Sequence, residues 1–254
     1  SVKDITSQKD IHDAERIVQA DERLDELIAK AREELKESPE VPAKVYKLVD
    51  LLCKREEDKF EDAAIEALMK AYQASDNYNF KMRADDIRMR QMNRKTLAMK
   101  TSNDPNAAKL QKREQLKLEL TVFHERLKHY PTDLRLRFEF GKRLFQARKY
   151  DEAIPILQEA RNDPKNRNQC NYYVGRCFFE KGYFDQAIDV LATAIEGYEI
   201  EGDTISKNLH YWLGRSHESA GHIPEAMKAF GQLLQWDYNF LDVRERMDNI
   251  RSKG

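Results

Sequence analysis

Repetition in the second half of the sequence constrains the fold more than any other feature. Gly141 and Gly175 lie 34 residues apart, and the same interval separates Ala153 from Ala187, Leu157 from Leu191, and Ala160 from Ala194. A third copy follows after 39 residues, so the connection EGYEIEGDTISKN contains five additional residues. A fixed interval of this length indicates stacked supersecondary units, each of which needs its neighbours to bury its apolar face.

The repeated segments resemble tetratricopeptide repeats. FGKRLFQARKYDEAIPILQEARNDP fits the family pattern, and YVGRCFFEKGYFDQAIDVLATAI and WLGRSHESAGHIPEAMKAFGQLL repeat it. The sequence departs from the pattern where the family's tryptophan is replaced by Arg137, Asn171 and His210, and where Tyr238 replaces the third closing proline. The resemblance implies an all-α, right-handed α-solenoid of antiparallel helix hairpins with a non-enzymatic role as a protein-binding scaffold or adaptor.

Small residues within the repeats let two helices of a pair approach closely. We expect the repeat-packing positions to be Gly141, Ala153, Gly175, Ala187, Gly214 and Ala226. The residues after the third copy predict a capping helix that buries Val243 and Met247. Its polar outer face would consist of Arg244, Glu245, Asp248 and Arg251.

The first 140 residues contain no glycine. This absence argues against Asn-Gly hairpins and phosphate-binding loops, and therefore against β and nucleotide-binding folds. Apolar periodicity and proline positions predict helices over 10–37, 45–52, 60–71, 78–100 and 105–130. We expect residues 1–133 to form an N-terminal helix and degenerate, elongated repeat-like pairs, and residues 134–254 to form three repeats with the cap. Together they would make one continuous solenoid of about a dozen helices.

Residues 78–100 predict a helix with two apolar faces. Phe80, Ala84, Ile87 and Ala98 lie on one side, and Met82, Met89, Met92 and Met99 lie roughly opposite. A helix with this pattern is expected to pack between neighbours on both sides.

Charge argues against general nucleic-acid affinity. Lys and Arg number 44 and Asp and Glu 45, which gives a net charge of -1. Residues 81–100 are the exception, with seven cations: Lys81, Arg83, Arg88, Arg90, Arg94, Lys95 and Lys100. These spread around the helix axis instead of forming one stripe. A nucleic-acid-binding or regulatory helical-repeat protein is therefore the alternative function.

The sequence also gives an expectation of where in the cell the protein is located. It has no apolar run of about 18 residues, and its first ten residues lack the apolar core of a secretory signal. Three cysteines without a CxxC motif favour a reducing interior, so we expect a cytoplasmic protein without membrane contact. Cys170 and Cys177 share a helix face, as a redox pair or half a metal site would, but small buried residues are the favoured interpretation.

Catalytic motifs are missing. The sequence contains no GxSxG, Walker loop, GxGxxG or HExxH, and its six histidines are dispersed. We therefore expect no catalytic residue, no metal site and no cofactor. An enzyme whose site escapes motif recognition is the third hypothesis.

Stacking the three repeats places residues in columns. The resemblance implies that the first helix of each pair lines a concave groove, with Phe138, Tyr172 and Tyr211 in one column and Lys142, Arg176 and Arg215 one turn further on. Arg135 adds to the cations, and Phe145 and Phe179 add to the rings. This groove would bind a protein or peptide segment carrying carboxylates and apolar side chains. Family members that hold a C-terminal carboxylate have asparagine where this chain has Lys142.

Two alternatives stay open at this point. The rings could pack between repeats, with the cations solvated or paired with Glu139 and Glu180. The helix over 10–37 has near-heptad spacing and could pair with another chain, although packing on the first repeat is more common. The sequence does not determine the partner or the oligomeric state.

Overall fold

The described part of the chain is entirely helical in this computed structural model. It comprises residues 2–39, 41–101 and 104–253, and the side chains of residues 2–15, 17 and 253 are outside the description. These residues form twelve helices and no strand: α1 (Val2–Glu37), α2 (Pro42–Cys53), α3 (Asp58–Ser75), α4 (Tyr78–Lys100), α5 (Pro105–His129), α6 (Leu134–Gln146), α7 (Tyr150–Ala160), α8 (Arg167–Glu180), α9 (Phe184–Glu196), α10 (Thr204–Ala220), α11 (Ile223–Trp236) and α12 (Val243–Lys253). The prediction of an all-α fold with about a dozen helices is confirmed.

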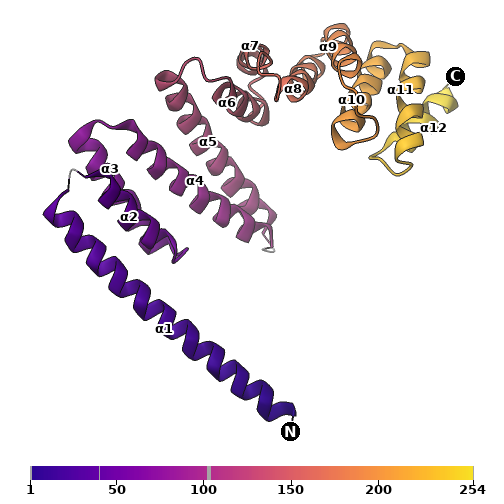
Figure 1. Cartoon of the computed structure of the whole chain (residues 1–254). Coiled ribbons are helices and arrows are strands. Elements are labelled where there is room, and N and C mark those ends of the chain that lie inside the picture. Colours follow the sequence, from indigo (N-terminus) through magenta and orange to yellow (C-terminus); the bar gives the residue numbers. More distant parts are fainter. Residues whose placement is uncertain (1, 40, 102–103, 254) are drawn as a thin grey trace. The chain divides into compact units, whose positions relative to one another are not determined.

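The helices group into two compact units, residues 1–115 and 116–254, with the division inside α5 (Figure 1). The sequence predicts a boundary at residue 133, after this helix. That boundary and the single continuous solenoid stay predictions. Each unit is described below by itself.

Four helices of the first unit pack in chain order. α1 packs against α2, α2 against α3, and α3 against α4. All four contribute to one apolar core, which includes Ile28, Ala31, Val49, Leu52, Ala64, Leu68, Phe80 and Ile87. The predicted helical periodicity therefore marks the buried faces of this unit.

Helix ends in the first unit are built without glycine. Pro42 occupies the first turn of α2, and Asp76 ends α3 in the left-handed region at φ 52°. Asn77 Oδ1 accepts from the backbone N of Asn79 at 3.1 Å at the start of α4. Asp104 Oδ1 accepts from the backbone N of Asn106 and of Ala107, each at 3.0 Å, and so caps α5. Asp and Asn residues thus form the helix ends of this unit, including a left-handed residue of the kind that glycine often supplies.

α1 ends at Glu37, as predicted, but begins at Val2 instead of residue 10. Its C-terminal half packs within the unit, because Ile28 and Ala31 are buried and Arg55 binds the carboxylates of Asp21 and Asp25 at 2.7 and 2.6 Å. The helix extends well beyond α2 in Figure 1. Val18 is exposed, and the side chains of Ala14 and Ile17, which belong to the predicted pattern, lie outside the description.

The two faces of α4 differ from each other. Phe80, Ala84 and Ile87 are buried against the rest of the unit, as predicted. Ala98, which is predicted on the same face, is exposed. On the opposite face Met82, Met89 and Met92 are half-buried and Met99 is exposed. On the methionine side, Gln111 of α5 donates to Met92 Sδ at 2.8 Å, and the packing of α4 between neighbours on both sides stays a prediction.

The second unit contains three helix hairpins, α6 with α7, α8 with α9, and α10 with α11. The predicted packing glycines lie at the crossing of each pair. A β-carbon on Gly141 or Gly175 would lie 2.6 Å from Leu157 or Leu191, and one on Gly214 would lie 2.5 Å from Phe230. Ala153, Ala187 and Ala226 on the second helices are fully buried. Close helix approach therefore explains the repeated small residues.

The first helices of the three hairpins form the inner side of the unit. α8 packs directly against both α6 and α10, whereas no comparable packing joins α7 to α9 or α9 to α11 within 116–254. The three first helices are thus crowded together and the second helices are spread apart. We call the side formed by α6, α8 and α10 the inner face.

The turn within each hairpin has a residue with a left-handed backbone conformation, at the same position of all three repeats. Gly182 and Gly221 have φ of 78° and 83°, the left-handed region in which glycine is unstrained. The first repeat has Arg148 at this position, with φ 59°. One non-glycine residue therefore adopts the conformation that glycine supplies in the other two repeats.

α12 closes the array as predicted. Val243 and Met247 are buried with Tyr211, Phe230 and Leu233. Arg244, Glu245, Asp248 and Arg251 are exposed on its other side. The polar outer face makes α12 a cap.

Candidate functional site

The inner face of the second unit places the predicted groove residues on three neighbouring helices. α6 carries Phe138, Lys142 and Phe145, α8 carries Tyr172, Arg176 and Phe179, and α10 carries Tyr211 and Arg215. The two predicted columns do not run as separate stripes. Rings and cations interdigitate across the repeats.

Arg176 is the centre of this arrangement. Its Cζ lies 3.8 Å from the ring centroid of Trp212 and 4.8 Å from that of Phe145, so the guanidinium contacts rings from both neighbouring hairpins. Nη1 donates to Tyr172 Oη at 3.2 Å, and Nη2 donates to Glu180 Oε1 at 3.3 Å. Stacking on rings on both sides holds the side chain in place and leaves it 20% exposed.

Arg215 and Lys142, at the equivalent positions of the other two repeats, also lie over rings. Arg215 Cζ lies 5.2 Å from the ring centroid of Phe179 and 5.3 Å from that of Trp212. Lys142 Nζ lies 4.9 Å from the ring centroid of Phe138. We refer to these seven residues as the ring–cation ladder: Phe138, Lys142, Phe145, Arg176, Phe179, Trp212 and Arg215.

A hydrogen-bonded network anchors the C-terminal end of the ladder. Arg215 Nη1 donates to Tyr211 Oη at 3.2 Å, and Tyr211 Oη donates to Asp242 Oδ1 at 2.7 Å. Arg246 binds Asp242 and Glu218, each at 2.9 Å. Burial raises the pKa of Asp242, but the hydrogen bonds from Tyr211 and Arg246 outweigh it, and the net pKa lies below the usual value. Asp242 is therefore ionised and ties α10 to the cap.

Arg135 does not join the ladder. It lies exposed in the first turn of α6, where its backbone N donates to Asp133 Oδ1 at 2.9 Å. It makes none of the ring contacts described above. The other predicted residues of the groove do lie on the inner face, but Phe138 and Tyr211 are buried and act as its floor.

Sequence reasoning missed two rings. Trp212 stacks on Arg176 and Arg215, and its ring centroid lies 5.1 Å from that of Phe179. Tyr173 lies 5.2 Å from Phe145 and 6.3 Å from Phe138 between ring centroids. They occupy one repeat position, 39 residues apart and one residue after Tyr172 and Tyr211. Aligning that next column would have found them.

The structure has features of both interpretations of the columns, the binding groove and the packing of rings between repeats. The rings do pack between repeats. Lys142 Nζ lies 3.4 Å from Glu139 Oε1, and Arg176 pairs with Glu180. The side chains of Lys142 and Arg176 nevertheless stay 24% and 20% exposed. The arrangement combines internal packing with an accessible cationic surface.

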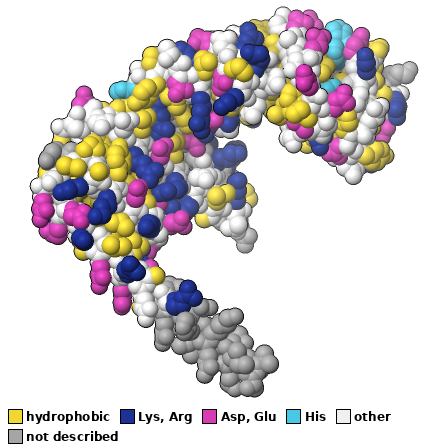
Figure 2. Space-filling view, viewed as in Figure 1, with side chains coloured by type: hydrophobic (Ala, Val, Ile, Leu, Met, Phe, Trp, Pro, Cys, Tyr) yellow, Lys and Arg dark blue, Asp and Glu magenta, His cyan; other side chains and the backbone are white. Residues whose placement is uncertain are grey.

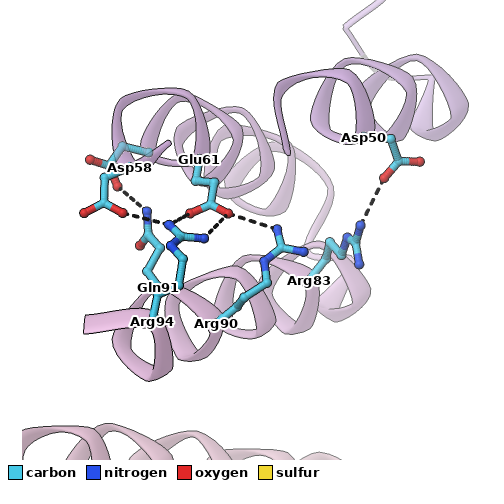
Figure 3. A network of polar contacts seen from close by, with 8 residues as sticks. Asp50, Asp58, Glu61, Arg83, Arg90, Gln91 and Arg94 are labelled. Carbon is cyan, nitrogen blue, oxygen red and sulfur yellow. Dashed lines mark hydrogen bonds and ion pairs between the residues drawn. The ribbon is translucent and has the colours of Figure 1, made fainter. Parts of the chain in front are cut away.

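The basic residues of α4 are engaged with carboxylates. Figure 3 shows Glu61 of α3 facing Arg90 and Arg94 of α4. Glu61 is fully buried, and Arg94 donates to both of its oxygens at 3.0 and 2.6 Å, while Arg90 lies 3.2 Å from one of them.

Other cations of α4 are also paired with carboxylates. Arg83 pairs with Asp50, Lys95 with Asp58, and Lys81 and Arg88 both pair with Asp85. Basic and acidic side chains are correspondingly interspersed over the face shown in Figure 2. Six of the seven predicted cations are thus in ion pairs within the unit, which does not support the nucleic-acid alternative.

The cysteines are buried. Cys170 and Cys177 are fully covered, and burial raises the pKa of each thiol to about 12. Thiols of this kind are poor nucleophiles and metal ligands. This favours the interpretation of small packing residues over a redox pair.

Two further features concern metals and membranes. His217 and His222 approach each other, with 3.4 Å between their Nδ1 atoms. Among the described side chains, no three His, Cys, Asp or Glu residues gather as a metal ion would need.

None of the described helical segments is apolar over a length that would span a membrane.

No protein-family model matches the sequence, and no curated protein does either. Solved structures do resemble the chain. YrrB, described as a TPR protein with an unusual peptide-binding site, is 15% identical, with a TM-score of 0.61 over 86% of this chain and 97% of YrrB. MamA from residue 41 onwards, from Desulfovibrio magneticus RS-1, is 14% identical, with a TM-score of 0.54 over 78% of this chain and 97% of that chain. These likenesses assign an α-solenoid fold.

Proposed function

Because the chain has a tetratricopeptide-repeat fold, we propose that it is a non-enzymatic scaffold or adaptor whose inner face binds a segment of another protein. The ring–cation ladder is the observation that carries this proposal. It lies on the side of the unit where three helices converge. A peptide there would contact residues from all three repeats at once.

The ladder's chemistry favours a partner with carboxylates next to apolar side chains. Guanidinium and ammonium groups form charge-assisted hydrogen bonds with carboxylates, and the rings offer apolar area at a small entropic cost. Arg176 and Arg215 are already held by stacking and by tyrosine hydroxyls. Little rotamer freedom would be lost on binding, so preorganisation would favour affinity.

The comparison with YrrB supports the class of function. That protein is described as a TPR protein with an unusual peptide-binding site. The present chain would likewise differ from family members that hold a terminal carboxylate through asparagine, because Lys142 stands at that position. We therefore propose recognition of internal acidic and apolar residues of the partner segment.

Selection from a random peptide library on the intact chain tests the proposal. The expected result is enrichment of peptides that combine Asp or Glu with apolar residues and that compete with one another for one site. Selection of no peptide above background, or of peptides that bind equally well after the ladder's cations are removed, would refute it.

A further inference from the structure

The connection between α9 and α10 builds a small pocket of its own. This is the connection with five additional residues. Residues of its segment 197–203 line the pocket together with residues of α10 and of the end of α11. The pocket has a volume of about 150 Å³. It is lined in part by Tyr198, Glu201, Leu209, His210 and Trp236.

The three lining rings are held in fixed positions. Trp236 and His210 lie almost perpendicular, at 86°, with 4.8 Å between ring centroids, so they form a corner. Gly202 allows the loop to approach Trp236, because a β-carbon there would lie 3.3 Å from the indole ring. Tyr198 Oη donates to Asp203 Oδ2, which fixes the third ring.

The loop around the pocket is acidic. Residues 196–203, EGYEIEGD, contain four carboxylates and no Lys or Arg. Glu201 belongs to the pocket wall and is exposed. His210 adds no positive charge that would repel a bound cation, because burial lowers its pKa and keeps the ring neutral. Its Nδ1 donates to Ser206 O at 2.9 Å, so Nε2 is left as an acceptor.

Rings set at right angles beside a carboxylate suit a cation that is itself partly apolar. Aromatic faces attract cations, and quaternary ammonium groups are recognised in this way. A methylated ammonium presents methyl groups in place of N–H donors. Ile195, Ile200 and Leu209 offer apolar surface for such groups, beside the polar lining residues Ser206 and Gln232. The volume is well below the roughly 300 Å³ at which pockets for drug-sized ligands begin.

We propose that this pocket binds a methylated ammonium group, as found in a free quaternary ammonium compound or in a methylated lysine side chain. The rings of Tyr198, Trp236 and His210 contact the methyl groups. Glu201 supplies the countercharge. The site is separate from the inner face and does not depend on the function proposed for it.

Titration with choline tests the proposal, because 3,3-dimethylbutan-1-ol has the same shape without the charge. Trp236 lies in the pocket, so tryptophan fluorescence reports binding directly, with calorimetry as a second readout. The expected result is that choline binds about tenfold more tightly than the neutral analogue and than ethanolamine. Equal binding of choline and its neutral analogue, or no binding of choline at millimolar concentration, would overturn the proposal.

Two exposed glutamates provide matched variants. Glu201→Gln should weaken choline binding about threefold to tenfold. Glu199→Gln changes the charge of the same loop equally but does not line the pocket, and should bind as the unaltered chain does. An equal effect of both would contradict a local countercharge. A short peptide with trimethyllysine then identifies the source: tighter binding than choline indicates a methylated protein, and weaker binding a free compound.

Discussion

A β-carbon on Gly175 would lie 2.6 Å from Cγ of Leu191, closer than non-bonded carbon atoms approach each other, so something would have to shift. Gly141 stands in the same relation to Leu157 in the preceding repeat. The 34-residue interval in the sequence is therefore a repeated contact between the two helices of a hairpin. This contact sets how closely α8 and α9 can pack.

Replacing Gly175 with alanine should force these helices apart. We expect Gly175→Ala to lower the free energy of unfolding by about 1–3 kcal/mol in urea denaturation, as overpacked cores do. Gly231→Ala is the matched control, because a β-carbon at this position of α11 meets nothing within 4 Å. The control should gain up to about 1 kcal/mol from higher helix propensity. Equal effects of the two substitutions would contradict the contact.

This contact also explains why so much of the second unit could be predicted. A glycine followed sixteen residues later by a large apolar residue is a local pattern, and three copies in one frame define the hairpins. The relation between α4 and its neighbours could not be predicted in the same way. Periodicity marks Met82 and Met89 as an apolar face but does not say which helix, if any, covers it.

Arg148 occupies the left-handed position that Gly182 and Gly221 occupy in the later repeats. A side chain in this region costs roughly 1 kcal/mol, so Arg148→Gly should leave stability unchanged or raise it by up to about 1 kcal/mol. Gly182→Ala, where no atom would contact the new β-carbon, should lower stability by about 1 kcal/mol through backbone strain alone. Thermal denaturation of both variants checks the opposite signs. A loss of stability in Arg148→Gly beyond 1 kcal/mol would argue against strain at this turn.

Glu61 and Arg94 join α3 to α4 through a buried carboxylate. Removing that charge leaves Arg90 and Arg94 without their shared partner, so Glu61→Gln should cost about 2 kcal/mol or more. Asp50→Asn removes a carboxylate that is mostly exposed and bound to Arg83, and should change stability by less than about 0.5 kcal/mol. Urea denaturation of the two variants gives the comparison. Similar values would mean that burial of Glu61 is energetically unimportant.

The lowered pKa of Asp242 predicts a pH dependence. A carboxyl group whose pKa is lower in the folded state stabilises the fold above its unfolded pKa of about 3.9, and this contribution is lost progressively as pH falls from that value through the lower pKa of the folded state. Asp242→Asn should therefore lower the melting temperature at pH 7, and the difference from the unaltered chain should shrink at pH 3. A difference that stays constant between these pH values would contradict the ionised state of Asp242.

The site was less predictable than the fold. Repeat alignment placed Lys142, Arg176 and Arg215 at equivalent positions and so on one face. It could not show that Arg176 is stacked between Phe145 and Trp212, because the contacts between adjacent hairpins depend on side-chain direction. Arg135 makes none of these ring contacts, and its part in binding stays a prediction.

The most direct measurement compares peptide affinity in two triple variants. One replaces the ladder's cations, Lys142→Gln, Arg176→Gln and Arg215→Gln. The other replaces three exposed cations elsewhere on the same unit, Arg161→Gln, Lys165→Gln and Lys228→Gln. Both lose three positive charges, and circular dichroism checks that both stay helical. The inner-face proposal predicts that an acidic, apolar peptide selected on the intact chain binds the first variant at least about tenfold more weakly and the second unchanged. Equal affinity of the peptide for both folded variants would contradict it.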